Sequence, residues 1–478
     1  MSTAVRAPLA GIARNTTWVT PAIVLADVGA LQISLALGYL LRLLLASWFT
    51  AEIGPAQILG VAAGILLLPV INYQIGLYPG YLLGPVERLR RRMLATLAVF
   101  GGLVAWDNIV ARGALSRGVL LATFVFALVL PPLAEAAARA FLIRRERWGM
   151  PVVMLGAGST GRALAKTLLD EPQLGLRPVA FLDNRLDAWN RTIEGIPVMG
   201  PLGFAPEFEG RADAAILSLP DIGKEDATAL LQELNFPRVI VIPDLAGAAS
   251  LWVTARDLGG SLGFEIKKNL MIPRNHLLKA LMDRLIALPL FVASLPVMLV
   301  AALWIKLSSS GPAFFRQVRE GFGGRQLAVW KLRTMHVDGD RVLDEWLNAH
   351  PEDRARWNSH FKLKRDPRVL PVIGRILRLT SLDELPQLWS VLKGEMSLVG
   401  PRPLPYYHLE HFPSEFRKLR TRVLPGLTGL WQISARSDGD LKVQEALDSY
   451  YIRNWSPWLD LYILARTFAA VVRARGAY

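Results

Sequence analysis

Two neighbouring carboxylates, Asp383 and Glu384, stand in the stretch TSLDELPQLWSVLKGEMSLVGPRP and could do chemistry on phosphates. Proline is tolerated in the first turn of a helix, so Pro386 predicts a short helix that starts a residue or two before it and ends at Gly394. Asp383 then falls near the N-cap, where the helix dipole favours ionised carboxylates and incoming phosphate. On the acids alone, a plain helix cap with a solvated Glu384 is an equal alternative.

Basic residues elsewhere in the C-terminal region favour a phosphate site around this pair. They are Lys331 and Arg333 in KLRTM, Arg378, Arg402 in GPRP, and Arg422 and Arg436 on either side of PGLTGLWQIS. The planar fork of arginine suits bidentate phosphate binding, and lysine acts as a point charge. Two acids that are surrounded by many basic residues and lie near an apolar segment predict a site at which two phosphate groups are joined. A divalent metal bound by carboxylate and phosphate oxygens would relieve the repulsion between the anions.

The composition indicates a membrane protein. Of the 478 residues, 52% are hydrophobic, the net charge is +14 and cysteine is absent. Without cysteine there can be no disulfide, zinc–thiolate site or cysteine nucleophile. The positive charge fits cytoplasmic loops, anionic lipids and phosphate-bearing substrates. The basic residues flank apolar runs and no nucleic-acid module is present, so nucleic acid is not an expected partner.

Four long apolar segments within residues 1–146 predict a four-helix transmembrane bundle, because each is near the ~20 residues that cross ~30 Å of hydrocarbon. The segments are 18–48, 57–73, 93–110 and 119–138. Arginines before the first, between the second and third, and after the fourth place the N-terminus and everything after residue 140 in the cytoplasm. Asp27 and Arg42 are expected to pair inside the bundle or to reach its end.

Residues 147–262 predict a Rossmann-like parallel α/β domain. Apolar runs of strand length in MPVVMLG, RPVAFLDNR, ADAAILSLP and RVIVIPD alternate with helical patterns. Gly156, Gly158 and Gly161 form a GxGxxG turn, and Asp183 follows at the spacing of a ribose-binding acid. A single glycine fingerprint is weak support for a cofactor. Nucleotide binding and a purely structural or assembly role therefore both stay open.

A linker at 263–278 leads to a mainly helical domain at 279–478, which begins with a second kind of membrane segment. Residues 285–305 are apolar and long enough to span, but Pro289 and Pro296 interrupt them and both flanks are basic. Positive charge on both sides predicts a re-entrant helix, about residues 281–306, that bends at Pro296 and returns to the same face. Ser294 can satisfy a backbone group that the bend frees. An ordinary fifth span is the alternative.

The motifs KLRTM, TSLDELPQLWSVLKGEMSLVGPRP and PGLTGLWQIS closely resemble those of the polyprenyl-phosphate hexose-1-phosphate transferases, the bacterial monotopic phosphoglycosyl transferases. The resemblance covers about residues 275–478, and the four-helix bundle with its Rossmann-like domain matches the long form of the family. The stretch GLYPGYLLGPVERLR, residues 76–90, looks like the undecaprenyl-phosphate galactose phosphotransferase branch. Many relatives carry Ser-Pro at the helix break, whereas Leu295 precedes Pro296 here.

This resemblance implies a two-step reaction at the inner membrane of a bacterium, with the catalytic domain on the cytoplasmic face. Asp383 would attack the sugar-linked phosphate of a UDP-hexose and expel UMP, and undecaprenyl phosphate would then accept the phosphosugar. Glu384 would hold Mg²⁺, together with Asp383, or take a proton. The phosphates and substrate would be bound by Lys331, Arg333, Arg378, Arg402, Arg422, Trp431, Gln432 and Arg436.

The family also implies a role in starting O-antigen, capsule or exopolysaccharide synthesis, and a homodimer. Galactose is the expected sugar, and glucose is the alternative. A membrane-bound sugar-nucleotide dehydratase can share a similar front end, but it needs a second glycine-rich domain and a YxxxK pair, which this chain lacks. A non-catalytic assembly scaffold is a further alternative, against which the intact acid pair argues.

Overall fold

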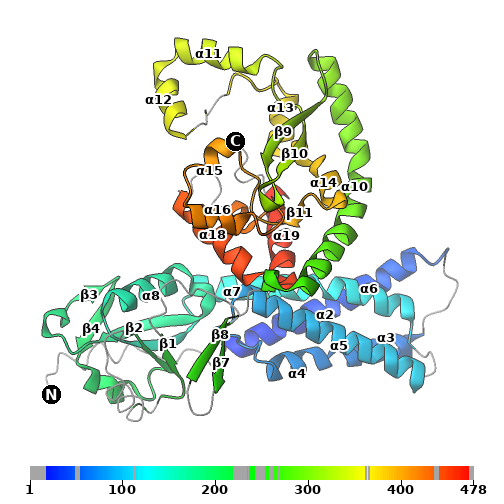
Figure 1. Cartoon of the computed structure of the whole chain (residues 1–478). Helices are drawn as coiled ribbons and strands as arrows, with labels where there is room; N and C mark the ends of the chain where they lie inside the picture. Colours follow the sequence, from blue (N-terminus) through cyan, green and yellow to red (C-terminus); the bar gives the residue numbers. More distant parts are fainter. Residues whose placement is uncertain are drawn as a thin grey trace. The chain divides into compact units, whose positions relative to one another are not determined.

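The computed structural model describes residues 18–48, 54–110, 115–218, 234, 236–242, 253–257, 262–266, 269–360, 363, 366–434 and 441–472 (Figure 1). The chain folds as two compact units, residues 1–247 and 248–478. The first contains a helical bundle and a parallel sheet, and the second contains the acid pair. The predicted combination of apolar helices with a parallel α/β part is therefore confirmed.

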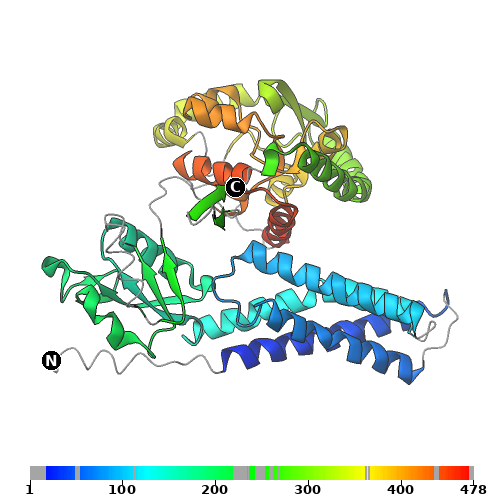
Figure 2. The same ribbon diagram turned by 60° about the horizontal axis from the view of Figure 1, so that its bottom comes forward.

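The helical bundle consists of mostly apolar helices, from 8 to 26 residues long, that lie side by side (Figure 2). They are α2 (Val19–Leu44), α3 (Pro55–Ile65), α4 (Leu67–Gln74), α5 (Pro85–Ile109), α6 (Arg117–Ala127) and α7 (Leu130–Arg144). Among the described residues, four helices are long and apolar enough to cross a membrane: Val19–Leu44, Gln57–Gln74, Arg117–Arg144 and Arg274–Ser308. The predicted segment 93–110 lies in α5, which is not among these four and whose first turns carry several arginines.

Charged residues inside the bundle pair with one another. Asp27 is fully buried and lies 2.7 Å from Arg92, whose other terminal nitrogen lies 2.6 Å from Glu135. Arg88 approaches Glu135 at 2.6 Å as well. An isolated buried charge is costly, whereas mutual pairing with good geometry compensates the lost hydration. The expectation that Asp27 pairs inside the bundle is confirmed.

The parallel sheet of the first unit has the strand order β3-β4-β2-β1-β5-β6. Its strands are β1 (Met150–Leu155), β2 (Leu176–Leu182), β3 (Thr192–Ile193), β4 (Ile196–Gly200), β5 (Ala214–Leu217) and β6 (Val239–Val241). All pairs are parallel except β3 with β4. Helix α8 (Ser159–Asp170) follows β1, and every residue of β1 is buried, as a strand covered on both faces requires.

The second unit is mainly helical with short strand pairs. Its strands are β7 (Val253–Asp257), β8 (Leu262–Ile266), β9 (Phe314–Glu320), β10 (Gln326–Leu332), β11 (Ser397–Val399) and β12 (Gly426–Thr428). Its helices are α10 (Pro273–Ser308), α11 (Gly339–Ala349), α12 (Pro351–His360), α13 (Ile373–Leu379), α14 (Gln387–Lys393), α15 (Tyr406–Leu409), α16 (Ser414–Arg420), α17 (Leu430–Ser434), α18 (Leu441–Asn454) and α19 (Pro457–Val472). The predicted boundary between residues 262 and 263 lies inside β8.

Helix α10 buries one stripe along its whole length and exposes apolar side chains elsewhere. The stripe consists of Lys279, Asp283, Ala287, Ser294, Met298, Ala301 and Ile305. These positions recur at helical spacing, so a single face of α10 packs on the unit. Figure 1 shows α10 as one curved helix, and Ser294 donates a 2.7 Å hydrogen bond to the Phe291 carbonyl in the turn before Pro296. The helix therefore continues through Pro296, and a return to the same membrane face at this proline stays a prediction.

Both ends of α10 contact the same folded unit. Near its start, Lys279 lies 2.7 Å from Asp460 of α19, and Asp283 accepts hydrogen bonds from the Ser397 hydroxyl at 2.7 Å and the Leu398 amide at 3.1 Å. Near its end, Ala301 and Ile305 enter an apolar cluster with buried residues from the β9–β10 hairpin and the segment through α13. In the sequence, the acid pair lies between the buried residues that pack on the end of α10, the last of which is Leu377, and the residues that bond to Lys279 and Asp283 near its start, the first of which is Ser397.

Candidate active site

The acid pair lies on a short 3-10 turn, Leu382–Glu384, just before α14. Helix α14 begins after Pro386, has no side-chain cap and ends at Gly394, which takes the left-handed conformation at φ +80°. The predicted end at Gly394 is confirmed. The predicted position of Asp383 near the N-cap is wrong, because the 3-10 turn separates the acids from α14 and turns Asp383 towards Lys331.

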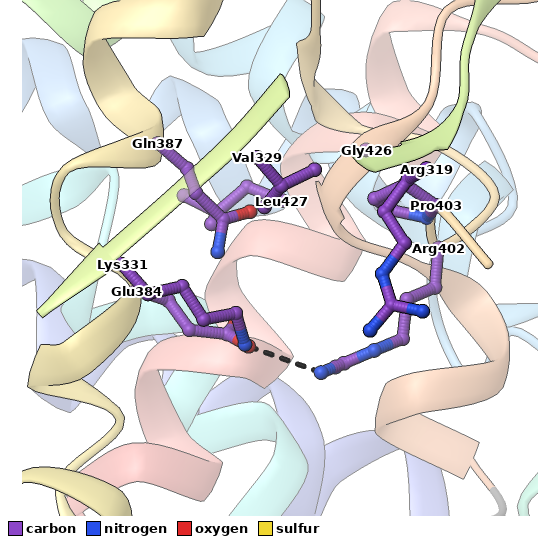
Figure 3. Close-up of a pocket in the computed structure, with 9 residues that line it drawn as sticks. All are labelled: Arg319, Val329, Lys331, Glu384, Gln387, Arg402, Pro403, Gly426 and Leu427. Carbon is purple, nitrogen blue, oxygen red and sulfur yellow. Dashed lines mark hydrogen bonds and ion pairs between the residues drawn. The ribbon is translucent and has the colours of Figure 1, made fainter. Parts of the chain in front are cut away.

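Two cations predicted from the sequence meet this pair. The Lys331 ammonium, supplied by β10, lies 2.6 Å from Glu384 Oε1 and 4.0 Å from Asp383 Oδ2. Arg402, in the loop after β11, donates to the same Oε1 at 3.0 Å (Figure 3). Glu384 therefore bridges a lysine from a hairpin and an arginine from a different strand pair, which fixes both cations beside Asp383.

The two carboxylates have different electrostatic environments. Burial acts to raise the pKa of Glu384, but Arg402 and Lys331 outweigh it and lower that pKa to about 2. Burial raises the pKa of Asp383 above its usual 3.8; Lys331, Arg378 and Arg402 oppose the change, and the neighbouring Glu384 adds to it. Glu384 is thus the permanent anion of the pair, and the cations around it also favour ionisation of Asp383.

Tight backbone packing holds the Arg402 loop in place. Strands β11 and β12 are parallel, and a Cβ at Gly426 would lie 2.0 Å from the Gly400 nitrogen, so glycine is required there. The buried Arg420 donates to the Arg402 carbonyl at 2.6 Å and to Asp448, also at 2.6 Å. This buried pair fixes the backbone from which the Arg402 side chain extends.

The other predicted residues are distributed differently. The Arg333 guanidinium donates to the carbonyls of Ser310 at 2.7 Å and Ser309 at 3.1 Å, so it binds the end of α10 and not the acids. Arg378 donates to the Thr334 hydroxyl at 3.0 Å and lies close enough to Asp383 to affect its pKa.

Four further predicted residues follow the PGLTG segment or flank it. Arg422 is exposed and does not line the pocket beside the acids. Trp431 and Gln432 lie on α17, outside that pocket lining, and Gln432 donates to the Leu427 carbonyl at 3.3 Å. Arg436 lies outside the described residues. The structure therefore brings together the acids, Lys331 and Arg402, with Arg378 nearby.

A small pocket beside the pair includes residues that the sequence reasoning missed. Its lining consists of Arg319, Val329, Lys331, Glu384, Gln387, Arg402, Pro403, Gly426 and Leu427 (Figure 3). In the antiparallel register of β9 and β10, Arg319 pairs with Leu327 and Phe315 pairs with Lys331. Because side chains alternate along a strand, Arg319 shares a face with Lys331. That alternation was the signal available in the sequence.

The glycine turn after β1 is held by hydrogen bonds and close packing with neighbouring residues of the same chain. Gly156 has φ +107°, and a Cβ at Gly161 would lie 2.1 Å from the Gly156 carbonyl oxygen. Asp183 accepts a 2.7 Å hydrogen bond from the Ala157 amide and pairs with Arg185 at 3.0 Å. Gly158 caps α8. The predicted ribose-binding acid thus holds the turn itself, which favours the structural role, and nucleotide binding stays a prediction.

Comparison with known proteins identifies the family. The family model described as bacterial sugar transferase matches residues 274–474, and a model described as CoA-binding domain matches residues 75–234. The chain is 35% identical to an uncharacterized sugar transferase of Haemophilus influenzae, over 76% of this chain and 78% of that one. The chain belongs to the bacterial sugar transferase family. It is therefore a membrane-associated sugar-phosphate transferase.

Two other bacterial sugar transferases have more specific names. The chain is 34% identical to the undecaprenyl-phosphate galactose phosphotransferase of Salmonella typhimurium, over 76% of each chain. It is 30% identical to the UDP-glucose:undecaprenyl-phosphate glucose-1-phosphate transferase of Xanthomonas campestris, over 81% of this chain and 82% of that one. The resemblance drawn from the C-terminal motifs is confirmed.

Proposed function

We propose that this transferase moves hexose-1-phosphate from a UDP-hexose to undecaprenyl phosphate, releases UMP and forms undecaprenyl-diphospho-hexose. The observation that carries the proposal is the acid pair held by Lys331 and Arg402 on the unit that contains α10. Galactose is the proposed sugar, supported by the Salmonella relative, and the Xanthomonas relative supports glucose as the alternative. The product would start O-antigen, capsule or exopolysaccharide synthesis.

The reaction proceeds in two displacements. An oxygen of Asp383 forms a bond to the sugar-linked phosphorus, and the bond from that phosphorus to the bridging oxygen breaks, so the electron pair leaves with UMP. A phosphate oxygen of undecaprenyl phosphate then forms a bond to the same phosphorus and releases the carboxylate. Lys331 and Arg402 stabilise negative charge on the transferred phosphate. Covalent catalysis divides one difficult encounter of two anions into two easier steps.

Magnesium fits the donors beside the reacting acid. Both cations that contact Glu384 use its Oε1, so Oε2 can still accept a ligand beside Asp383. The described residues contain no cluster of three or more acidic or histidine side chains, and Mg²⁺ commonly uses one or two carboxylates together with substrate phosphates. Asp383 and Glu384 would hold the ion, and it would neutralise charge on the donor diphosphate.

The packing of α10 supports a re-entrant helix. If α10 crossed the bilayer, its two ends would lie in different compartments, yet both contact the same folded unit. The exposed face is apolar and suits lipid, while the buried stripe faces protein. The acid pair would then lie at the level of the lipid headgroups on the cytoplasmic face of the inner membrane. A homodimer is part of the same proposal and rests on the family resemblance.

Purified enzyme assayed with Mg²⁺, undecaprenyl phosphate and a panel of UDP-sugars tests the function. UMP release is expected with UDP-galactose or UDP-glucose, and the sugar with the higher kcat/KM identifies the donor. Intact-mass analysis should detect a phosphosugar on Asp383 when the lipid is omitted, and Asp383→Asn should abolish both signals. Turnover without an adduct, or an adduct on another side chain, would contradict the mechanism.

A further inference from the structure

Arg319 differs from the other cations of the pocket because no carboxylate of the described residues forms an ion pair with it. Among the described residues, none of the ion pairs includes Arg319, whereas Lys331 and Arg402 both contact Glu384. Its Nη2 donates to the Gln317 side chain at 2.5 Å. Its Nη1 is buried and has no hydrogen-bond partner in the described part of the chain. A buried donor without an acceptor is unfavourable, and a ligand oxygen would remove that cost.

The surroundings of Arg319 favour an anion. Figure 3 shows its guanidinium beside that of Arg402, on the side of the pocket away from Lys331 and Glu384. Burial lowers the pKa of Arg319 and the nearby Arg402 lowers it further, whereas Tyr407, which lies within hydrogen-bonding reach of the Arg319 side chain, acts in the opposite direction. Two guanidinium groups that line one small pocket repel each other unless an anion lies between them. Arginine is also the side chain best suited to bind phosphate oxygens in pairs.

The order of the side chains distinguishes the two phosphates of the donor. The phosphate that Asp383 attacks must lie at the acid pair, within reach of Lys331 and Arg402. The next phosphate along the diphosphate, which carries the nucleoside, then extends past Arg402 towards Arg319. We propose that Arg319 binds this leaving phosphate and stabilises the charge that UMP acquires; this inference rests on the proposed function.

The chemistry places the need for Arg319 in the first displacement. As the oxygen of Asp383 bonds to the sugar-linked phosphorus, the bridging oxygen keeps the electron pair of the broken bond and becomes a terminal oxygen of UMP. Its added negative charge develops where Arg319 can donate. In the second displacement the leaving group is the Asp383 carboxylate, UMP is absent, and Arg319 has no anion to stabilise. The two half-reactions therefore depend on Arg319 to different extents.

The test measures each half-reaction in full-length enzyme with Arg319→Gln. Adduct formation is followed in a single turnover with UDP-sugar. Discharge is followed after long loading, removal of the nucleotide and addition of undecaprenyl phosphate. We expect adduct formation to slow about 10- to 100-fold, which is less than the largest loss measured for a single oxyanion donor because the site is partly open. The rate of discharge should stay within about twofold of the wild-type rate. Inhibition by added UMP should weaken, and Arg319→Lys should recover part of the rate.

Arg316→Gln is the matched control, because Arg316 lies on the same strand, is exposed and points to the opposite face of the hairpin. It should leave both half-reactions unchanged. Equal losses in adduct formation and discharge, no loss in either, or the same loss in the control would overturn the assignment of Arg319. If the wild-type enzyme neither releases UMP nor forms an adduct, the proposed function itself fails and this inference falls with it. Matching thermal unfolding curves for both variants exclude misfolding as the cause.

Discussion

Replacing Lys331 by methionine removes the cation that lies closest to both members of the acid pair. The ammonium is 4.0 Å from Asp383 Oδ2 and 2.6 Å from Glu384 Oε1, with 23% of its side chain exposed. Two unit charges 4 Å apart interact by about 4 kcal/mol at an effective dielectric of about 20. Partial exposure reduces this, so we take about 2 kcal/mol as the loss in the transition state. At about 1.4 kcal/mol for each factor of ten, adduct formation should slow about 30-fold.

The same variant should change the pH dependence in a defined direction. In the proposed mechanism Asp383 attacks as a carboxylate, so adduct formation should fall as the pH drops through its pKa, which burial raises above 3.8. Lys331 opposes this rise. Removing Lys331 therefore moves the pKa of Asp383 further up, and the acidic limb of the pH–rate profile should shift to higher pH.

Single-turnover adduct formation across a pH series measures both effects. Lys393→Met is the control, because Lys393 is an exposed cation at the far end of α14, where it approaches only Glu395, at 3.9 Å, among the ion pairs of the described residues. The control should keep the wild-type rate and profile. A Lys331→Met enzyme that retains more than a third of the wild-type rate, or whose acidic limb shifts to lower pH, would refute this electrostatic reasoning.

Three further outcomes are expected from other parts of the chain. Because the chain has no cysteine, His276→Cys and Ser308→Cys provide single labels at the two ends of α10, and both should react from the same side of sealed vesicles; labelling from opposite sides would contradict re-entry. Arg420→Lys should raise the KM for UDP-sugar about tenfold, as the Arg402 carbonyl loses a charged donor; an unchanged KM would show that Arg420 does not position the loop. Asp183→Ala should lower the free energy of unfolding by about 1–3 kcal/mol by orphaning the Ala157 amide, without changing the rate of UMP release; equal loss of activity would instead indicate a functional role for the glycine turn.

Local patterns were sufficient to predict much of the fold. The buried strands of the parallel sheet, the glycine turn at Gly156 and the helix end at Gly394 each depend on residues close together in the sequence. The meeting of Glu384 with Lys331 and Arg402 followed from the family motifs, although these residues come from separate strand pairs. Local sequence patterns and the family motifs were therefore enough to predict the residues at the centre of the site.

The contacts that the sequence did not predict join distant segments. Arg333 was expected near phosphate, and in the structure its guanidinium donates to the Ser309 and Ser310 carbonyls just after α10. For Asp183 the sequence left ribose binding and a structural role open, and its contacts with the Ala157 amide and Arg185 favour the structural role. Arg319 was missed because its position depends on the register of β9 against β10. Such partners are set by tertiary packing, which spacing along the chain does not specify.

The hydrogen bonds from Ser397 and Leu398 to Asp283 make α10 part of the same rigid body as the strand that leads to Arg402. If α10 re-enters the membrane as proposed, a lipid carrier that approaches along it meets a reaction centre whose height above the acyl chains is set by the protein and not by the local thickness of the bilayer. Thinner or thicker membranes should change how often the carrier's head group arrives, while the geometry that it encounters there stays the same.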